Sequence, residues 1–292
     1  MHLGHLDAGV HEVASVPADP VPAIVEAEAE GSTAAIFADI RDTLHVDVVN
    51  LIWRHLATMP GALDWVWSTL KPLYLGPALA AADDVRQGIA MPAIVRMSED
   101  TLAAAGLDEE ALTAIRDILD SYYHTNALAL VAFSAFLSCI EGAEETLPRL
   151  AVDPNIIVGR VPHRAALPRL TPISEMTPSL ARLVDELNCF GEDSDTALVA
   201  SMYRHLSHWP VYLALTRTLL APLHHNGDLH RLGAGTRRLG EDHGRRLSPL
   251  LSMPALAPQT GSEAVAAVRR FVTHPIARMT GVCGLMRGAL PH

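Results

Sequence analysis

The chain contains one segment twice. Residues 53–73 and residues 203–223 align at a constant offset of 150, and eight aligned positions then carry the same residue. These pairs are Arg54/Arg204, His55/His205, Leu56/Leu206, Pro60/Pro210, Leu63/Leu213, Leu70/Leu220, Pro72/Pro222 and Leu73/Leu223. Ordinary composition would give only about one or two identities in a window of this length. We therefore interpret the chain as an internal duplication, and we expect a site between two related halves.

Apolar residues recur at helical spacing in both halves. In the first half, Ile36, Ile40 and Leu44 follow one another every four residues, which places them on one helical face. Hardly any segment alternates apolar and polar residues as a half-buried strand would. The pattern predicts an all-α fold in which two pseudo-symmetric helical repeats pack around a central cavity.

Prolines suggest where the repeats begin and end. We expect an N-terminal arm over residues 1–33, a first repeat over 34–147, a proline-rich linker over 148–178 and a second repeat over 179–292. Near the C-terminus the alignment shifts, because residues 267–287 match residues 114–134 at an offset of 153.

Charge and composition exclude some classes of protein. The net charge of -11 disfavours a nucleic-acid-binding surface, which would show a basic patch. Cys139, Cys189 and Cys283 form no CxxC or zinc-ligand spacing, and this indicates a reducing compartment. The apolar run from Ala127 to Ile140 is too short for a membrane span. No signal peptide is visible at the N-terminus, so we expect a cytoplasmic, soluble protein that does not bind membranes.

The two halves differ in chemistry at two aligned positions. Asp195 in the second half matches His45 in the first, and Asn126 in the first half matches Met279 in the second. A pseudo-twofold axis would bring equivalent helices to one interface, where a carboxylate and a carboxamide could face one cavity. An apolar cavity with a few converging polar groups is the usual form of a small-molecule site.

Simpler interpretations of these residues remain open. Asp195 at a helix start can serve as a cap, and Asn126 within a helix can bond a backbone carbonyl. The repeated Arg54, Arg204, His55 and His205 suggest structural roles. His205 and His208 form an HxxH pair, but no further ligand completes a metal motif, so we expect no metal.

The repeat resembles a known enzyme family. The segments DIRDTLHVDVVNLIWRHLATMPGALDWVWSTLKPL, YYHTNALAL and FGEDSDTALVASMYRHLSHWPVYLAL are similar to those of the group I DL-2-haloacid dehalogenases. The resemblance covers nearly all of the chain after about residue 33. It implies an all-helical, cofactor-independent enzyme that has its site between two related halves and forms a homodimer.

The resemblance also implies a mechanism. An aspartate, helped by an asparagine, activates a water that attacks C2 of a 2-haloalkanoic acid with inversion, on both enantiomers and without a covalent ester. Asp195 matches the catalytic aspartate, and Asn126 is the best match for the asparagine. Ser194 and its neighbours would offer backbone N–H groups to the substrate carboxylate. The remaining substrate-binding candidates are His45, Val46, Val49, Tyr123, Phe271 and Ile276.

One departure from the family leaves the substrate open. Known members line the first-half wall with aromatic residues, whereas this chain has His45, Val46, Val48 and Val49 there. One alternative is a related hydrolase or small-acid-binding protein that acts on a non-halogenated substrate. Another is a non-catalytic helical interaction module in which Asp195 is only a cap, because a fold does not fix a reaction.

Overall fold

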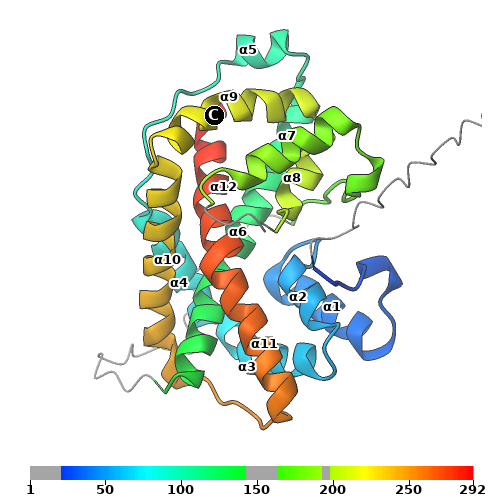
Figure 1. Cartoon of the computed structure of the whole chain (residues 1–292), viewed down its shortest axis with the longest axis vertical. Coiled ribbons are helices and arrows are strands. Elements are labelled where there is room, and N and C mark those ends of the chain that lie inside the picture. The colour runs from blue at the N-terminus through cyan, green and yellow to red at the C-terminus, as the bar shows by residue number, and fades with distance from the viewer. Residues whose placement is uncertain (1–20, 143–163, 193–197, 292) are drawn as a thin grey trace, which may run out of the picture.

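A computed structural model describes residues 21–142, 164–192 and 198–291 of the chain. Within these ranges the protein is built from helices and contains no β-strand (Figure 1). The prediction of an all-α fold is therefore confirmed for the described residues.

The helices follow one another in a similar order in the two halves. The first half contains α1 (Gly31–Leu44), α2 (Leu51–Leu56), α3 (Ala62–Tyr74), α4 (Pro77–Gly88), α5 (Glu99–Ala104) and α6 (Glu109–Ile140). The second contains α7 (Pro178–Cys189), α8 (Ser201–Leu206), α9 (Pro210–His225), α10 (Asp228–Leu247), α11 (Pro258–Phe271), the π-helical η4 (Val272–Ile276) and α12 (Ala277–Ala289). Helices α2 and α8 begin and end at positions 150 residues apart. Short 3₁₀ turns lie at Glu26–Glu28, Ile173–Glu175 and Ser248–Leu250.

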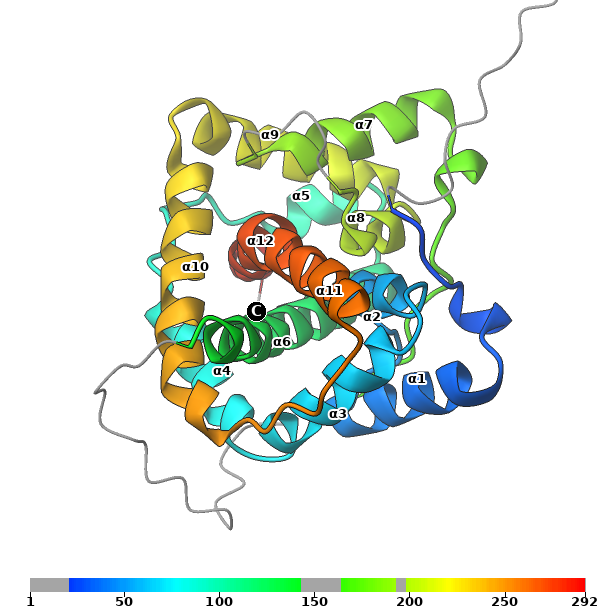
Figure 2. The ribbon, with the colours of Figure 1, turned by 60° about the horizontal axis from the view of Figure 1, so that its bottom comes forward.

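Two long helical rods form the centre of the molecule. Figure 2 shows α6 beside the continuous rod made by α11, η4 and α12, with α10 along one side of both. Helices α1 and α3 lie below this pair in that view, and α7 and α9 lie above it. The site described below lies where the two rods meet the short helices α2 and α8.

Helix α6 is buried along most of its length. It is 32 residues long, more than twice the length of the apolar run noted in the sequence. It begins directly after Asp108, whose side chain caps the N-terminus by accepting a hydrogen bond from the Ala111 N–H (2.8 Å). By length and composition this helix could cross a membrane, but 83% of its most apolar window is buried inside the protein. That burial is characteristic of a core helix.

Glycines allow α10 to approach α6 closely. A Cβ at Gly240 would lie 2.3 Å from Leu130 Cγ, and a Cβ at Gly244 would lie 2.7 Å from the backbone nitrogen of Ala135. No side chain fits at such distances without moving the helices apart. The two glycines therefore set the separation of α6 and α10.

Prolines occur at different places in the helices. Pro60 precedes the start of α3 by two residues, and Pro72 lies inside the last turn of α3. Pro222 occupies the equivalent place in α9. A proline near the end of a helix costs little when the carbonyl that it leaves unpaired can be satisfied in another way. Pro77 and Pro210 do begin helices, as prolines at the first helical position commonly do.

The segment before α1 is attached to the first half. Glu26 accepts hydrogen bonds from Arg41 Nη1 and from the Val49 N–H, both at 2.9 Å. Burial raises the pKa of this carboxyl, and the bonds to Val49 and Arg41 counteract the rise. The Val49 backbone is thus fixed to the end of the N-terminal segment.

Candidate active site

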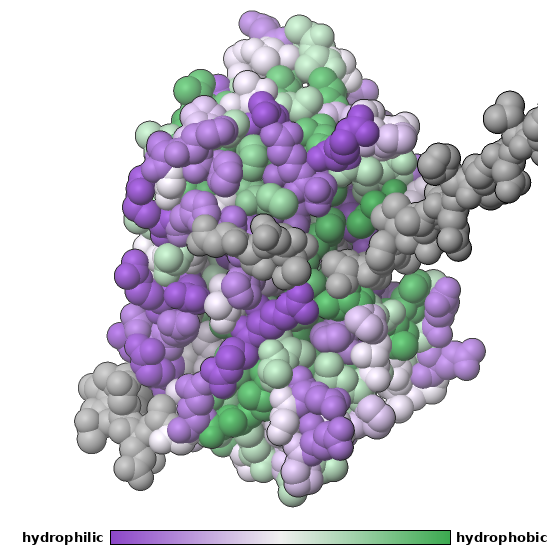
Figure 3. Space-filling view, in the orientation of Figure 1, coloured by the Kyte–Doolittle hydropathy of each residue, from purple (hydrophilic) through white to green (hydrophobic). Residues whose placement is uncertain are grey.

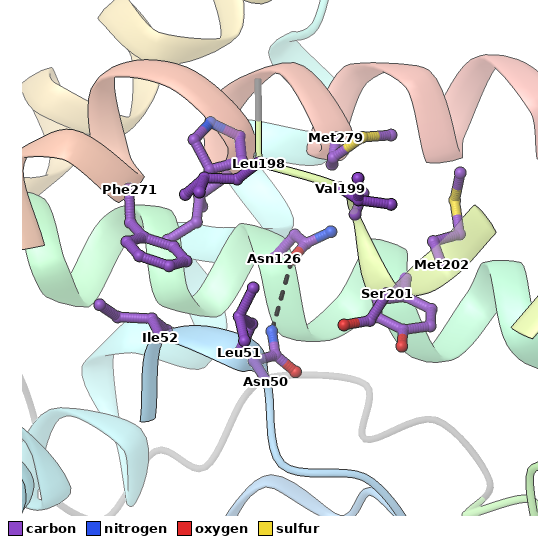
Figure 4. Close-up of a pocket in the computed structure, with 14 residues that line it drawn as sticks. Asn50, Leu51, Ile52, Asn126, Leu198, Val199, Ser201, Met202, Phe271 and Met279 are labelled. Carbon is purple, nitrogen blue, oxygen red and sulfur yellow. Dashed lines mark hydrogen bonds between the residues drawn. The ribbon is translucent and has the colours of Figure 1, made fainter. Parts of the chain in front are cut away.

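A cavity of about 50 Å³ lies at the junction of the two halves. Its wall is mostly apolar, and Figure 4 shows the side chains that point into it. The lining residues are Asn50, Leu51, Ile52, Tyr122, Asn126, Leu198, Val199, Ala200, Ser201, Met202, Phe271, Pro275, Ile276 and Met279.

The cavity is built from equivalent positions of the two repeats. The start of α2 and the start of α8 contribute residues related by the offset of 150, and the two central rods contribute residues related by the offset of 153. The pairs are Asn50/Ala200, Leu51/Ser201, Ile52/Met202, Tyr122/Pro275 and Asn126/Met279. Each polar residue in these pairs has an apolar counterpart, and all the polar residues except Ser201 belong to the first repeat. The duplication therefore creates the cavity, and divergence gives it one polar side.

Two amides meet on the polar side. Asn50, at the N-cap position of α2, donates from Nδ2 to Asn126 Oδ1 over 3.4 Å (Figure 4). Asn126 is only 7% exposed. This long bond uses one of the two acceptor positions of the Asn126 oxygen. The other position can accept a hydrogen bond from a small molecule or a water, and the apolar surroundings strengthen any such interaction.

A tyrosine–histidine pair connects the halves beside the cavity. Tyr122 Oη lies 2.8 Å from Nδ1 of His205, which belongs to α8. Burial, followed by the neighbouring His208 and Arg204, lowers the pKa of His205 to about 3. Burial also raises the pKa of the Tyr122 phenol. The imidazole is therefore neutral at pH 7, and the phenol donates the hydrogen bond to it.

The repeated histidines and arginines have structural contacts. His55 Nδ1 lies 2.7 Å from the Pro22 carbonyl oxygen, and its ring stacks on Phe271 of the other half with centroids 5.9 Å apart. Arg204 Nε donates to the Thr171 carbonyl (3.0 Å). His55 and His205 thus each contact a ring from the opposite half of the chain.

A buried thiol lies next to the cavity wall. Cys283 Sγ donates to the sulfur of Met202 over 3.1 Å. Burial raises the pKa of this thiol, and a hydrogen bond with Asn126 only partly counteracts the rise. The thiol is therefore protonated at neutral pH and is a poor nucleophile.

The structure brings together three of the residues expected at the site. Asn126, Phe271 and Ile276 all line the cavity. Asp195 and Ser194 lie outside the described residues. In the chain, Asp195 is three residues before Leu198, which lines the cavity.

Four expected residues lie elsewhere. His45 is exposed and ends α1 in the left-handed conformation (φ 53°), a conformation common for the residue that terminates a helix. Val46 and Val49 are buried in the hydrophobic core, because the segment between α1 and α2 turns them inward. Tyr123 points away from the cavity and donates to the Arg86 carbonyl over 3.2 Å. None of these four lines the cavity.

Three polar residues that were not predicted from the sequence also line it, namely Asn50, Tyr122 and Ser201. Tyr122 is one helical turn before Asn126 and therefore shares its face, so helical spacing alone would have favoured it over Tyr123. Asn50 and Ser201 had no such signal, because each lies at the start of a six-residue helix with no periodic pattern of its own.

No metal cluster accompanies this site in the described part of the chain. Among those residues, no three His, Cys, Asp or Glu side chains are grouped so that they could hold a metal ion. The described lining residues offer amide, phenol and hydroxyl groups to a bound molecule.

Comparison with known proteins provides the context for this cavity. No protein-family model matches the chain. A configuration-inverting 2-haloacid dehalogenase of Pseudomonas sp. (strain 113) is 25% identical over 232 residues, which cover 77% of this chain and 74% of that protein. An (R)-2-haloacid dehalogenase of Pseudomonas putida is 35% identical over 104 residues, 31% of this chain. The chain is thus similar in sequence to 2-haloacid dehalogenases. The match to the Pseudomonas putida dehalogenase spans only about a third (33%) of that relative's length.

Solved structures support the same fold. A D-2-haloacid dehalogenase mutant in complex with D-2-CPA superposes with a TM-score of 0.67 at 16% identity, over 94% of this chain and 98% of that one. Another D-2-haloacid dehalogenase mutant gives a TM-score of 0.68 at 17% identity, over 97% of this chain and 98% of that one. The helical fold of this chain is thus shared with these dehalogenase structures along almost its whole length.

Proposed function

We propose that the protein hydrolyses short 2-haloalkanoic acids to 2-hydroxyalkanoic acids and halide without a cofactor. The observation that carries the proposal is the apolar cavity between the repeats, with the Asn126 amide on its wall. Both matched relatives bear the name 2-haloacid dehalogenase, and this supports the choice of substrate. The small volume of the cavity favours acids with short chains.

In the proposed reaction a water attacks C2 directly. Asp195 removes a proton from the water as general base, and Asn126 Oδ1 accepts the other proton in a hydrogen bond and fixes the water's orientation. The C–O bond forms on the face opposite the halogen, and the halide leaves with the electron pair of the carbon–halogen bond. The configuration at C2 is therefore inverted, and no ester with the protein forms.

The apolar wall has two roles in this scheme. Phe271, Ile276 and Met279 exclude bulk water from the reacting atoms, so that the carboxylate keeps its basicity. The same side chains give the departing halide a polarizable surface. Both enantiomers would react, because the substrate can bind with the hydrogen and the alkyl group at C2 in exchanged positions while the water stays on the Asn126 side.

The deciding experiment is halide release by the purified protein. We expect chloride from both (R)- and (S)-2-chloropropanoate, and we expect lactate of the opposite configuration by chiral chromatography. A folded protein that releases no halide from any short 2-haloacid would contradict the proposal. If non-halogenated acids then raised the thermal midpoint while haloacids did not, the site would belong to a different small-acid reaction.

Isotope labelling tests the absence of an ester. In a single turnover in H₂¹⁸O, with enzyme in excess, the label should appear in the hydroxyl of the product. A first-turnover product that carries ¹⁶O from a protein carboxylate would establish a covalent intermediate instead.

We also propose that the protein is a cytoplasmic homodimer. Light scattering coupled to gel filtration should give twice the chain mass of 31.4 kDa. A monomeric mass for the active protein would remove this part of the proposal and leave the reaction untouched.

A further inference from the structure

A second cavity is lined by residues of α10, of η4 and α12, and of the segment that follows α7. It has a volume of about 430 Å³. Its wall consists of Gly191, Glu192, His230, Gly233, Ala234, Arg237, Thr273, His274 and Arg278. Arg278 is adjacent in sequence to Met279 of the first cavity, and because consecutive helical residues point about 100° apart, the two side chains line different cavities. Nothing in the proposed dehalogenation uses this second cavity.

Basic side chains dominate the wall. Two arginines and two histidines face one carboxylate, that of Glu192, in a chain whose net charge is -11. His230 and Arg237 come from one face of α10, seven residues apart, and His274 comes from η4. Figure 3 shows hydrophilic side chains gathered over α10 on this face of the molecule. The cavity is a local basic site in an acidic protein.

Arg278 is buried and only half satisfied. Its side chain is 4% exposed, and Nη1 donates to the carbonyl oxygens of Asn188 and Phe190 at the end of α7. Nε and Nη2 are buried and have no hydrogen-bond partner among the described residues. An unsatisfied donor at a buried position is costly, so these two nitrogens need a ligand from the cavity.

The two open nitrogens form one edge of the guanidinium. Nε–H and Nη2–H point in the same direction and match the two oxygens of a carboxylate or phosphate. Glu192 does not fill this edge, because its Oε2 lies 3.9 Å from Nε, beyond hydrogen-bond distance, while its Oε1 lies 3.3 Å from Nδ1 of His274.

Arg237 supplies a second donor to the same space. Its Nε is also buried without a hydrogen-bond partner in the described part of the chain, and it forms an ion pair with Glu241 at 3.6 Å. Two guanidinium groups whose Nε atoms lack a hydrogen-bond partner among the described residues therefore line one cavity.

We propose that this second cavity binds a small oxyanion, with one pair of oxygens on the Nε/Nη2 edge of Arg278 and a further oxygen on Arg237. The shared chemistry is that of a small carboxylate or an inorganic phosphate. The site is independent of the proposed function, since it shares no lining residue with the first cavity.

Calorimetric titration at constant ionic strength tests the site, with sodium phosphate and sodium malonate as separate probes. Wild-type protein should bind at least one of them at one site per chain. The probe that binds more tightly shows whether the site prefers a phosphate or a carboxylate. Arg237→Gln should weaken that binding about tenfold or more. Arg238→Gln is the matched control, because Arg238 is exposed on the same helix and does not line the cavity; it should bind like wild type.

Three further variants exclude trivial explanations. Glu192→Gln removes the one acid among the described residues of the wall. It should tighten binding, which a general loss of structure cannot do. Arg278→Lys keeps the charge and loses the two-pronged edge, so it should bind more weakly while its circular dichroism stays that of wild type. Asn126→Ala, in the other cavity, should leave the titration unchanged. Absence of binding by either probe, or equal binding by wild type and Arg237→Gln, would overturn the proposal.

Discussion

Asn50 and Asn126 form the only hydrogen-bonded pair of side-chain amides found in the described residues, and they do so on one side of the cavity alone. Their counterparts in the second repeat, Ala200 and Met279, cannot form such a bond. The first-repeat side of the cavity can therefore hold a water, and the opposite side remains apolar. In a duplicated scaffold, this asymmetry allows one side of the cavity to hold the attacking water and the other side to receive the departing halide.

Replacing Asn50 with its counterpart residue tests that asymmetry. In Asn50→Ala the Asn126 amide loses the donor that orients it, so we expect kcat/KM for 2-chloropropanoate to fall about tenfold, the effect of a misplaced positioning group. The thermal midpoint should change little. Asn226→Ala, at an exposed position, is the control and should keep full activity. A fully active Asn50→Ala enzyme would show that Asn126 needs no such partner.

The Tyr122–His205 bond should stabilise the junction of the halves. Tyr122→Phe keeps the ring and leaves Nδ1 of His205 buried without its donor, and we expect a loss of about 1–3 kcal/mol in the free energy of unfolding. Tyr123→Phe is the matched control next to it. Tyr123 is partly exposed, so its loss should stay below about 1 kcal/mol. Urea denaturation measures both, and equal losses would contradict the role assigned to His205.

Two buried histidines should make the fold sensitive to acid. Burial lowers the pKa of His205 to about 3 and that of His124 to about 4, both below the ordinary value of 6.5. The unfolded chain then takes up protons first as pH falls, so stability is highest above pH 6.5 and decreases through the window from 6.5 to about 4. Each histidine contributes a slope of at most about 1.4 kcal/mol per pH unit.

Urea denaturation at pH 7, 6 and 5 measures this slope. His205→Gln retains a polar side chain that does not titrate, so its stability should depend less on pH than that of wild type. The same slope in both proteins would mean that His205 is protonated in the folded state or does not control acid sensitivity.

The close packing of α10 on α6 gives a prediction on stability alone. In Gly244→Ala the new methyl group meets the Ala135 backbone nitrogen at 2.7 Å, and the overpacking should cost about 1–3 kcal/mol. At Gly235 on the same helix, a Cβ would meet no atom within 4 Å. Gly235→Ala should therefore stabilise the protein by up to about 1 kcal/mol. Thermal unfolding of both variants checks the sign of each effect.

Much of the fold could be predicted because matching residues at a constant offset indicate equivalent helices in the two halves, whatever the helix propensity of each segment. The identical bounds of α2 and α8, separated by 150 residues, follow directly from the Arg-His-Leu blocks. The aligned positions that differ in chemistry also led to Asn126, which lines the cavity. Comparison of the two halves was thus more informative than any single motif.

The wall of the cavity was harder to predict. Val46 and Val49 lie in an irregular segment, where no period tells which side chains face inward. Tyr122 and Tyr123 point about 100° apart around the helix. A prediction that is wrong by one residue therefore selects Tyr123, which faces away from the cavity, in place of Tyr122, which lines it. Ile276 faces the cavity although its aligned partner Tyr123 does not, because the π-helical turn at Val272–Ile276 changes the register of the second rod.

Asp195 is the base that activates water in the proposed reaction, and its replacement is the most direct test. We predict that Asp195→Asn lowers the rate of chloride release from both enantiomers of 2-chloropropanoate by about 10²–10⁴-fold, with unchanged circular dichroism. Asp193→Asn, two residues earlier in the chain, should retain activity within a few-fold of wild type. Chloride release by Asp195→Asn at the wild-type rate would contradict the role of Asp195 as the base.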